Sequence, residues 1–428
     1  MISREDAARR VRSAYARIAE VDRPEIFITL RPQAEVAADA DAVVDRVGAG
    51  EDLPLAGTLF AVKNNIDVAG VPTTAACPAF AYRPDEDAPV VGRLRAAGAV
   101  LLGVTNLDQF ATGLVGTRSP YGAVRHATDP ERISGGSSSG SGVAVGLGIV
   151  DFALGTDTAG SGRVPAAFQG IYGIKPSRGW SPRTGVVPAC HSIDVVTVMD
   201  TDLARARLAA SVLRGPDGLD PLAARPARDR APLRRIGVAV PEQLGTLAPG
   251  WPEAYRTAVG EWSAAGYEVV EVEVAGLLDA ARLLYDGAYV AERYTGVGEF
   301  IAAHPEDTDP TVRGIVLAAG EVAAWRLFAD LDALEIHRAR AEELWGRIDA
   351  LLLPTTVMHP TLREVAADPV GVNSTLGRFT NFVNLLDMSA LAYPAGEVSG
   401  LPFGVQLIGP AYADVPLADA VAAVVAAR

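Results

Sequence analysis

Two glycine-rich loops carry serines that could act as nucleophiles. Residues 134–142 read Ser-Gly-Gly-Ser-Ser-Ser-Gly-Ser-Gly, and residues 155–165 read Gly-Thr-Asp-Thr-Ala-Gly-Ser-Gly-Arg-Val-Pro. A serine hydroxyl is a weak nucleophile near neutral pH, so it needs a nearby base and donors for the oxyanion that forms after attack. Neither loop contains a histidine. A lysine is then the natural base, provided that it is held in its neutral form.

Lys63 is the candidate base. It ends the run Leu-Phe-Ala-Val-Lys at residues 59–63, and burial among apolar side chains favours the neutral amine because it penalises the charged ammonium. Glycine-rich turns let successive backbone N–H groups point at one spot, so the second loop can supply the oxyanion donors. We expect these donors to be the amides of Thr158, Ala159, Gly160 and Ser161.

The first loop has two alternative interpretations. A stretch rich in glycine and serine is most often a flexible linker, but residues 134–142 run directly into the apolar sequence Val-Ala-Val-Gly-Leu. A dinucleotide-binding turn is the other alternative, and it lacks the third glycine, a clear preceding strand and a Lys-Ser/Thr ending. Arg163 could bind substrate, but an arginine in a tight turn more often pairs with a buried carboxylate such as Asp157, which is the role we expect.

Short apolar runs alternate with helical patterns along the chain, and these elements must position the two loops. We expect strands at 58–62, 99–104 and 149–154, with helices at 90–97 and 143–147 between them. Further strands are expected at 236–240, 267–274, 351–353 and 404–408, with a long helix within 321–348. The alternation predicts an α/β/α sandwich whose large, mixed and mostly parallel central sheet is covered by helices.

We expect one domain over residues 1–428. Its parts are an N-terminal helical segment at 1–50, which Ser3 begins as a helix cap, and an internal linker at 214–232 that is rich in Pro, Asp and Arg. Residues 233–428 are expected to complete the same fold and to supply substrate-binding residues.

Composition excludes several classes of function. With 428 residues and 49% hydrophobic residues the chain can bury a large core, and a net charge of −14 argues against a nucleic-acid partner. The five histidines are scattered, and Cys77 and Cys190 form no ligand or disulfide pattern, so we expect no metal and no cofactor. We find no signal peptide and no apolar run long enough for a membrane. We therefore expect a cytoplasmic protein without a membrane partner.

The spacing of the candidate residues is similar to that of a known family. Ser161 lies 24 residues after Ser137, and Lys63 lies 74 residues before it. Together with the two loops, this pattern resembles the amidase signature family, whose members cleave amides with two serines and a lysine. The resemblance implies that Ser161 is the nucleophile, that Ser137 follows a cis peptide bond at Gly136–Ser137 and relays the proton, and that Lys63 is the base.

Longer stretches resemble the allophanate hydrolases of that family, namely residues 60–82, 105–122, 157–168, 185–190 and 380–387. Allophanate is urea that carries a carboxylate, so a cation and a phenol are natural recognition groups.

The allophanate hydrolases also suggest substrate-binding residues. The resemblance implies that Tyr285 and Arg293, eight residues apart on one helix, bind substrate, and that Gly113 contacts its amide through the backbone carbonyl. Without the resemblance, Tyr285 would be a core residue and Arg293 a surface charge paired with Glu292 or Glu299.

The resemblance implies an amidohydrolase that cleaves the C–N bond of allophanate and releases ammonia and CO2 or bicarbonate. The alternatives are an amidase for another small carboxylated urea or amide, biuret-like or malonamate-like, a glutaminase-type subunit of a tRNA amidotransferase, and a catalytically inactive amide-binding subunit. The sequence departs from the pattern at Asn64, where many relatives have Asp, and it has no counterpart of the usual C-terminal domain. A truncated chain, a homodimer and a pathway partner that supplies this domain's function all stay open.

Overall fold

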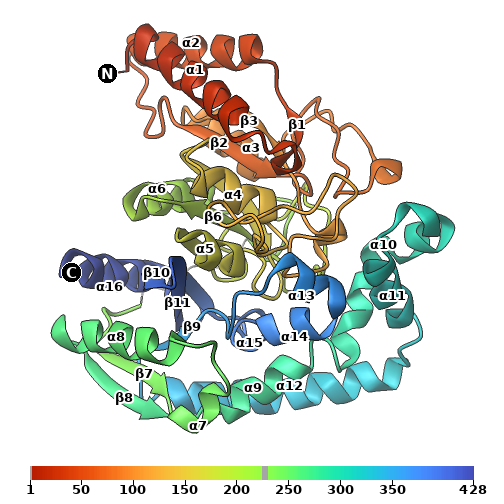
Figure 1. Ribbon diagram of the computed structural model, residues 1–428, viewed down its shortest axis with the longest axis vertical. Coiled ribbons are helices and arrows are strands. Elements are labelled where there is room, and N and C mark those ends of the chain that lie inside the picture. The colour runs from red at the N-terminus through yellow and green to blue at the C-terminus, as the bar shows by residue number, and fades with distance from the viewer. Residues whose placement is uncertain (1, 224–229) are drawn as a thin grey trace.

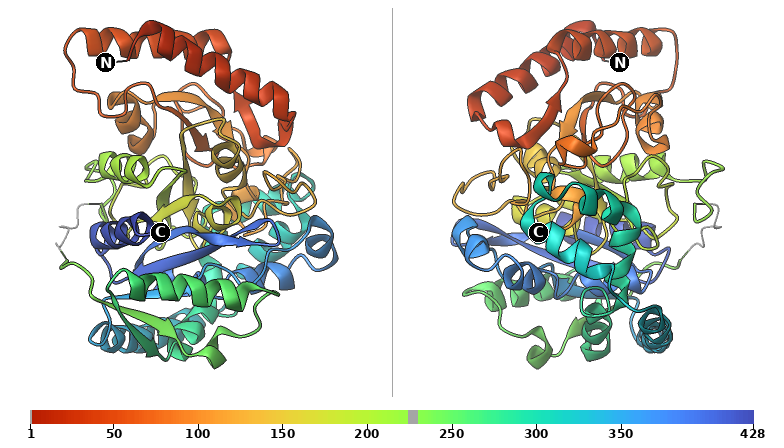
Figure 2. Two further views of the ribbon diagram at one scale, coloured as in Figure 1. Left: turned by 60° about the vertical axis from the view of Figure 1, so that its left-hand side comes forward. Right: turned by 90° about the vertical axis from the view of Figure 1, so that its right-hand side faces the viewer.

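A single sheet of eleven strands runs through the molecule, with helices on both faces (Figures 1 and 2). The computed structural model describes residues 2–223 and 230–428. The strand order is β1-β3-β2-β4-β6-β5-β10-β11-β9-β7-β8, which confirms the predicted α/β/α sandwich. The strands are β1 (Phe27–Leu30), β2 (Leu59–Lys63), β3 (Val100–Thr105), β4 (Phe152–Asp157), β5 (Tyr172–Lys175), β6 (Val195–Asp200), β7 (Arg235–Ala239), β8 (Glu268–Val272), β9 (Ala350–Pro354), β10 (Ser389–Val398) and β11 (Leu401–Gly409).

The prediction of a mostly parallel sheet is wrong. Four strand pairs are parallel, β2 with β3 and β4 and β7 with β8 and β9, whereas six pairs are antiparallel. The longest antiparallel pair is the hairpin of β10 and β11, whose turn at Ser399 and Gly400 has φ values of 54° and 77°. Positive φ at both central residues matches the twist of a two-residue hairpin, and no parallel crossover can be made by so short a turn.

Helices form a layer on each face of the sheet. Apolar side chains of α3, α6, α8 and α16 pack on one face, those of α1, α2 and α4 cover the N-terminal strands on the other, and those of α9, α12 and α15 cover the later strands there. The helices are α1 (Arg4–Val21), α2 (Gln33–Gly48), α3 (Pro89–Ala96), α4 (Ser139–Gly146), α5 (Arg163–Gln169), α6 (Leu203–Leu213), α7 (Pro241–Leu244), α8 (Trp251–Ala264), α9 (Ala275–Arg282), α10 (Ala291–Ala303), α11 (Pro310–Ala319), α12 (Ala324–Trp345), α13 (Leu362–Ala367), α14 (Gly371–Leu376), α15 (Asn381–Leu385) and α16 (Asp414–Ala426).

The strands that lead to the glycine-rich loops lie inside the sheet. Every residue of β2, β3 and β4 is buried, as expected where helices cover both faces and the strand sequence is apolar throughout. β4 begins three residues later than predicted. Ile149 and Val150 are buried, as in a strand, but they lie in the turn that precedes β4. The shift extends β4 to Thr156 and Asp157, next to the second loop.

The predicted linker lies between α6 and β7. Residues 214–223 and 230–232 contain no helix or strand, and residues 224–229 of the prediction lie outside the described residues. Strands from both sides of this segment join the one sheet. At the N-terminus, the Ser3 side chain accepts a hydrogen bond from the Asp6 amide and caps α1 as predicted.

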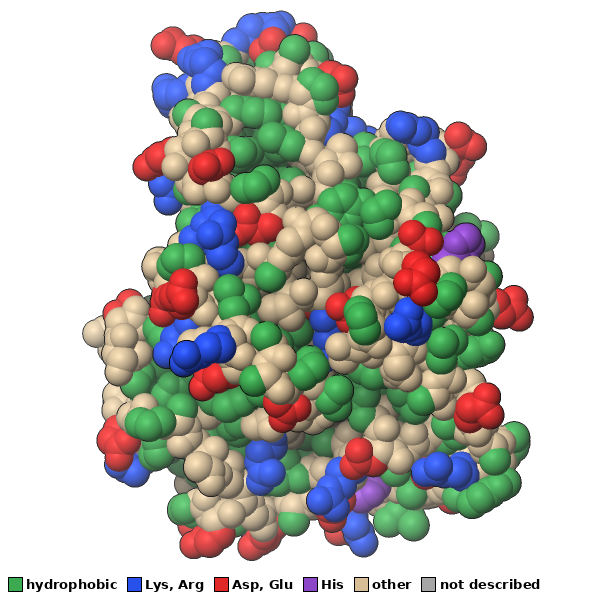
Figure 3. Space-filling view, turned by 45° about the vertical axis from the view of Figure 1, so that its right-hand side comes forward, with side chains coloured by type: hydrophobic (Ala, Val, Ile, Leu, Met, Phe, Trp, Pro, Cys, Tyr) green, Lys and Arg blue, Asp and Glu red, His purple; other side chains and the backbone are tan. Residues whose placement is uncertain are grey.

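Acidic and basic side chains are interspersed on the face of the molecule shown in Figure 3. Over the described ranges, no helix combines the length and the apolar character that crossing a membrane requires.

Candidate active site

Lys63 lies at the end of β2 in the interior of the protein. β2 is hydrogen-bonded to β3 on one side and to β4 on the other, and the Lys63 side chain is 0% exposed. Burial lowers the pKa of Lys63 to about 7, although the carboxylates of Asp108, Asp194 and Asp157 oppose the shift. A substantial fraction of this lysine is therefore a neutral amine near neutral pH, which is the form that accepts a proton.

Ser137 lies against this lysine. Lys63 Nζ and Ser137 Oγ are 2.7 Å apart, and the peptide bond before Ser137 is cis. The preceding glycine is required by space, because a Cβ on Gly136 would lie 2.2 Å from Asp108 Oδ2 and 2.6 Å from the Gly116 amide. The Asp108 amide donates to the Ser137 carbonyl at 3.1 Å. The sequence-derived pairing of Lys63 with Ser137 is thus present in the structure.

Ser161 is brought to the same place by the loop after β4. Its side chain is 2% exposed, and its carbonyl accepts a hydrogen bond from the Ser138 amide at 3.2 Å. Ser161 Oγ donates to the Gly113 carbonyl at 3.4 Å, and no hydrogen bond to Ser137 is present among the described residues. Proton transfer to Ser137 therefore requires the Ser161 hydroxyl to turn away from Gly113.

The backbone of the second loop is held by the Asp157 carboxylate. This carboxylate accepts hydrogen bonds from the amides of Gly160 at 2.8 Å and Gly162 at 3.1 Å. The Gly160 amide is thus already engaged. The amides of Thr158, Ala159 and Ser161 donate to no other group in the described part of the chain, so they are the loop amides left to bind an oxyanion.

Arg163 has the structural role that the sequence predicts. Its Nε and Nη2 donate to the two oxygens of Asp157 at 3.0 Å each, and both side chains are 0% exposed. Burial raises the pKa of the Asp157 carboxyl, but the Arg163 guanidinium outweighs this effect, and the pKa lies below its usual value. Arg163 also donates to Gln406 and Asn384, which ties the loop to the C-terminal part of the sheet.

Tyr285 and Arg293 meet, but the expectation that they share one helix is wrong. α9 ends at Arg282, Tyr285 lies in the turn that follows, and Arg293 lies on α10. The helical path is interrupted at Gly287, where a Cβ would lie 2.6 Å from the Leu283 carbonyl and 2.6 Å from Asp330 Oδ2.

The pair is nevertheless in direct contact. Arg293 Nη2 donates to the Tyr285 hydroxyl at 3.1 Å, and its guanidinium lies 5.4 Å from the centre of the tyrosine ring.

Arg293 is a buried cation that forms no ion pair in the described part of the chain, although the Asp194 carboxylate lies within electrostatic range of it. It is 2% exposed, Nη1 donates to the Thr112 hydroxyl at 3.0 Å, and Nε has no hydrogen-bond partner. In the described ranges it forms no ion pair, and Glu292 instead accepts two hydrogen bonds from Ser192. Thr112 directly precedes Gly113, whose carbonyl contacts Ser161. The guanidinium therefore lies close to Ser161.

Sequence reasoning missed two residues of the site. Thr156 Oγ1 lies 2.8 Å from Lys63 Nζ, and Asp108 accepts from the amides of Val115, Gly116 and Arg118 at 3.0–3.1 Å and so holds the loop that contains Gly113. Had the end of β4 been predicted correctly, Thr156 would have been placed beside Lys63, because β4 and β2 are neighbours in the sheet. Asp108 gave no signal, since its partners are backbone groups.

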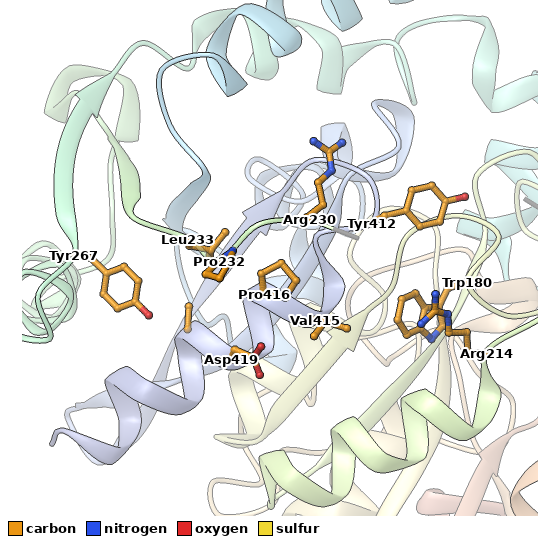
Figure 4. A pocket seen from close by; sticks show the side chains of 11 residues that line it. Trp180, Arg214, Arg230, Pro232, Leu233, Tyr267, Tyr412, Val415, Pro416 and Asp419 are labelled. Atoms are coloured by element: carbon orange, nitrogen blue, oxygen red, sulfur yellow. The ribbon is translucent and has the colours of Figure 1, made fainter. Parts of the chain in front are cut away.

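Of two surface pockets, one lies away from this site and the other borders it. Among the residues described, no group of three or more His, Cys, Asp or Glu side chains is arranged to hold a metal ion. The surface pocket in Figure 4 lies beside α16, and its lining includes Trp180, Arg214 and Tyr412 but none of the catalytic candidates. Another pocket, lined by α9, α14 and Asn381, has Tyr285 in its wall.

Comparisons with known proteins show which family the chain belongs to. The family model described as Amidase matches residues 9–417. The urea amidolyase of Lachancea kluyveri is 46% identical over 86% of this chain, and the matched part is 20% of that protein. The crystallised allophanate hydrolase of Kluyveromyces lactis has a TM-score of 0.90 at 40% identity, covering 98% of this chain and 70% of that one.

Two relatives of different name match over most of their own length. The AtzE protein of the 1-carboxybiuret hydrolase of Pseudomonas sp. (strain ADP) is 34% identical over 89% of this chain and 86% of its own. One component of the glutamyl-tRNA(Gln) amidotransferase of Symbiobacterium thermophilum is 35% identical over 95% of this chain and 90% of its own. This chain thus spans about a fifth of the urea amidolyase but nearly the full length of these two proteins.

Proposed function

Because this chain belongs to the amidase family and is a hydrolase acting on amides, we propose that its substrate is allophanate. The observation that carries the proposal is the buried guanidinium of Arg293, which forms no ion pair in the described residues and whose Nε has no hydrogen-bond partner there. Asp194 interacts with it only from beyond ion-pair distance. A buried charge without a direct counter-ion is costly, and the carboxylate of a bound substrate would supply one. Tyr285 adds a phenol at the same place.

The proposed reaction begins at Ser161. Its hydroxyl attacks the terminal amide carbonyl of allophanate, and its proton passes through Ser137 to neutral Lys63. The oxyanion that forms accepts hydrogen bonds from the amides of Thr158, Ala159 and Ser161, with Gly160 held by Asp157. The Lys63 ammonium then returns the proton to the leaving nitrogen, and ammonia departs from the acyl-enzyme.

Water completes the cycle by the reverse use of the same groups. Lys63 and Ser137 take a proton from water as it attacks the acyl carbonyl, and Ser161 regains its proton. The product is an N-carboxycarbamate, which can break down to ammonia and carbon dioxide. The contact between Lys63 and Ser137 at 2.7 Å supports this relay.

Substrate comparison tests the proposal. Ammonia release is measured for allophanate, malonamate, biuret, glutamine and a simple aryl amide, and kcat/KM is expected to be highest for allophanate. A higher value for malonamate or biuret would favour the alternative of another small carboxylated urea or amide. A higher value for glutamine would favour the glutaminase-type alternative. Either result would overturn the allophanate assignment and leave the amidase chemistry in place.

A catalytically inactive amide-binding subunit is the alternative from another class. It would release no ammonia from any of these substrates. The close contact of Lys63 with Ser137 and the burial of Ser161 argue for a working site.

The remaining predictions about organisation fit the proposal. We infer one domain over residues 1–428, which the single sheet supports, and a small-molecule substrate with no nucleic-acid or membrane partner. A cytoplasmic location, a homodimer and a pathway partner that supplies the C-terminal-domain function stay predictions.

A further inference from the structure

The Asp194 carboxylate is buried beside the loop that carries Ser161. Its exposed fraction is 4%, that of Thr158 is 1%, and the Thr158 hydroxyl donates to Asp194 Oδ1. We infer that Asp194 is a positioning residue, which holds the Thr158 side chain and so aims the Ala159 amide at the oxyanion. The inference rests on the proposed attack by Ser161 and adds a residue outside the relay.

The peptide groups between Asp157 and Gly162 differ in how they are held. Four of the five accept a hydrogen bond at their carbonyl, namely those after Asp157, Ala159, Gly160 and Ser161, from Asn384 Nδ2, Thr380 Oγ1 and the amides of Val164 and Ser138, respectively. The fifth lies between Thr158 and Ala159, and within the described ranges neither its carbonyl nor its amide is hydrogen-bonded. The nearest anchor for the Ala159 amide is therefore the Thr158 side chain.

An amide that binds an oxyanion cannot be fixed by a hydrogen bond of its own. Its N–H has to stay free for the negative charge that develops on the substrate oxygen, and it stabilises this charge best when it already points at it. Gly160, which follows Ala159, has a φ of 122° and adds the conformational freedom of a residue without a side chain. An anchor on the side chain before Ala159 restrains the peptide and leaves the N–H free.

Asp194 can serve as this anchor because its own position is fixed. Its oxygens accept hydrogen bonds from the Ala189 amide at 2.8 Å and from the Cys190 amide at 3.1 Å, so the carboxylate cannot turn without losing one of them. It forms no ion pair in the described part of the chain, and its charge acts on Lys63 and Arg293 from beyond ion-pair distance. The Thr158 hydroxyl is thus the side-chain donor that Asp194 binds directly.

A contact that aims an oxyanion donor acts on the transition state more than on the bound substrate. Loss of the Thr158 hydroxyl should therefore lower kcat and leave KM nearly unchanged. Binding of malonate at Arg293 should not change, because no oxyanion forms in that complex. A contact that merely stabilises the loop would instead weaken turnover and ligand binding together.

The test compares Thr158→Val, which keeps the shape and removes the hydroxyl, with Thr158→Ser, which keeps the hydroxyl. Thr158→Val is expected to lower kcat by about ten- to hundredfold, and Thr158→Ser is expected to stay within a few-fold of the unchanged protein. A small alkylboronic acid, which forms a tetrahedral adduct with Ser161, gives a second readout. Its inhibition constant should rise in Thr158→Val in proportion to the loss in kcat/KM, whereas that of malonate should stay the same.

Thr197→Val is the matched control. Thr197 is a buried threonine that packs against the same loop, since a Cβ on Gly162 would lie 2.7 Å from Thr197 Oγ1, and its hydroxyl has no hydrogen-bond partner among the residues described. This variant is expected to leave kcat and both inhibition constants unchanged.

A double variant links the effect to Asp194. Asp194→Asn should lower kcat as well, because one amide group cannot accept from the Thr158 hydroxyl and from two backbone amides at once. Since both substitutions remove the same hydrogen bond, Thr158→Val should cost little more in the Asp194→Asn protein. Fully additive losses would show that Asp194 does not act through Thr158 and would overturn the inference.

The remaining outcomes separate the inference from the proposed function. If Ser161→Ala stays active, the proposed attack itself fails. If Ser161→Ala is inactive while Thr158→Val keeps a normal kcat, the attack stands and the inference alone is overturned. Equal losses in kcat, malonate binding and boronic acid binding, or a loss that Thr197→Val reproduces, overturn it as well. Should Asp194→Asn not fold, the two Thr158 variants and the boronic acid decide.

Discussion

In the proposed relay Lys63 is the base, so its protonation state should control the rate of the reaction. Burial lowers its pKa to about 7, so the neutral base is lost as pH falls through this value. We expect kcat/KM to rise with pH between about 6 and 8 and to level off above that range. The measurement is kcat/KM for ammonia release at constant ionic strength across this range. A flat profile would show that no group of this pKa acts as the base.

The three relay residues should behave as one unit. Ser161→Ala and Lys63→Ala are each expected to reduce kcat by about 1,000-fold or more, because loss of either member disables proton transfer. Ser137→Ala is expected to be severe but less complete, since water can bridge the gap. Steady-state rates of the three purified variants check the order. Near-normal activity of Ser161→Ala, or fluorophosphonate labelling at another serine, would refute the assignment of the nucleophile.

A variant at Arg293 tests the identity of the substrate independently of the amide-cleaving chemistry. Its loss removes a charge-assisted contact of about 1.5–3 kcal/mol, which corresponds to a loss of about tenfold or more in catalytic efficiency. Arg293→Ala should therefore impair hydrolysis of allophanate far more than that of a neutral amide of similar size. Equal losses on both substrates would show that Arg293 is structural. A crystal soaked in malonate should place the acid between Ser161 and Arg293.

At the scale of elements, α10 is fastened to the loop before β6. Glu292 Oε1 accepts from the Ser192 amide at 2.7 Å and Oε2 from its hydroxyl at 2.6 Å. The same loop holds Asp194, which accepts from Thr158 of the oxyanion loop. The helix that carries Arg293 and the loop that carries Ser161 are thus joined through one loop.

Loss of this connection should loosen Arg293 without touching the relay. Glu292→Ala is expected to raise KM for allophanate several-fold at nearly constant kcat, because uniform binding is weakened. Glu299→Ala on the exposed side of the same helix is the control, and it should leave both constants unchanged. A fall in kcat alone in Glu292→Ala would contradict this view.

Sequence reasoning succeeded where local signals coincide with geometry. Lys63 was identified from the apolar run that ends at it and from a spacing similar to the family's. The serine loops were identified from their resemblance to the amidase signature, and their glycines are needed where backbones meet, as at Gly136. Tyr285 and Arg293 were identified through the resemblance to the allophanate hydrolases, but the single helix that was expected to carry both does not exist. The two residues meet because the helix is interrupted at Gly287, which packs against Asp330. This is a tertiary contact that no local sequence pattern predicts.

The whole sheet was harder to predict than its parts. The strands from β2 to β4 were recognised, but β5, β6 and β10 were not, and these three make four of the antiparallel pairs. Strand direction depends on which segments pair across long separations, such as β5 with β10. The apolar pattern of a strand buried on both faces is the same in either direction.

Acid stability of the whole molecule should depend on a buried histidine. The His359 ring stacks on Phe168 at 3.8 Å and lies 5.0 Å from the ring of His126, and burial lowers the pKa of His359 from 6.5 to about 3. Between these values the unfolded chain binds a proton that the folded protein does not, so stability is lost as pH falls from about 6.5 toward 3.

Denaturant unfolding at a series of pH values measures this effect. The His359 contribution to the slope of unfolding free energy is up to about 1.4 kcal/mol per pH unit in that window. His359→Gln should be less stable at neutral pH and should lose less of its stability on acidification. Curves for the two proteins that run parallel would show that His359 does not titrate on unfolding.

The order of the site along the chain bears on how such enzymes diversify. Lys63, Ser137 and Ser161 all precede the 214–232 segment, whereas Tyr285 and Arg293 follow it. If Tyr285 and Arg293 bind substrate as proposed, substitution in the later half would change which molecule is bound while Lys63, Ser137 and Ser161 stay in place. Relatives that share one fold would in this way differ in substrate specificity. Exchange of the segment from α9 to α11 between two relatives should therefore transfer the substrate preference of the donor.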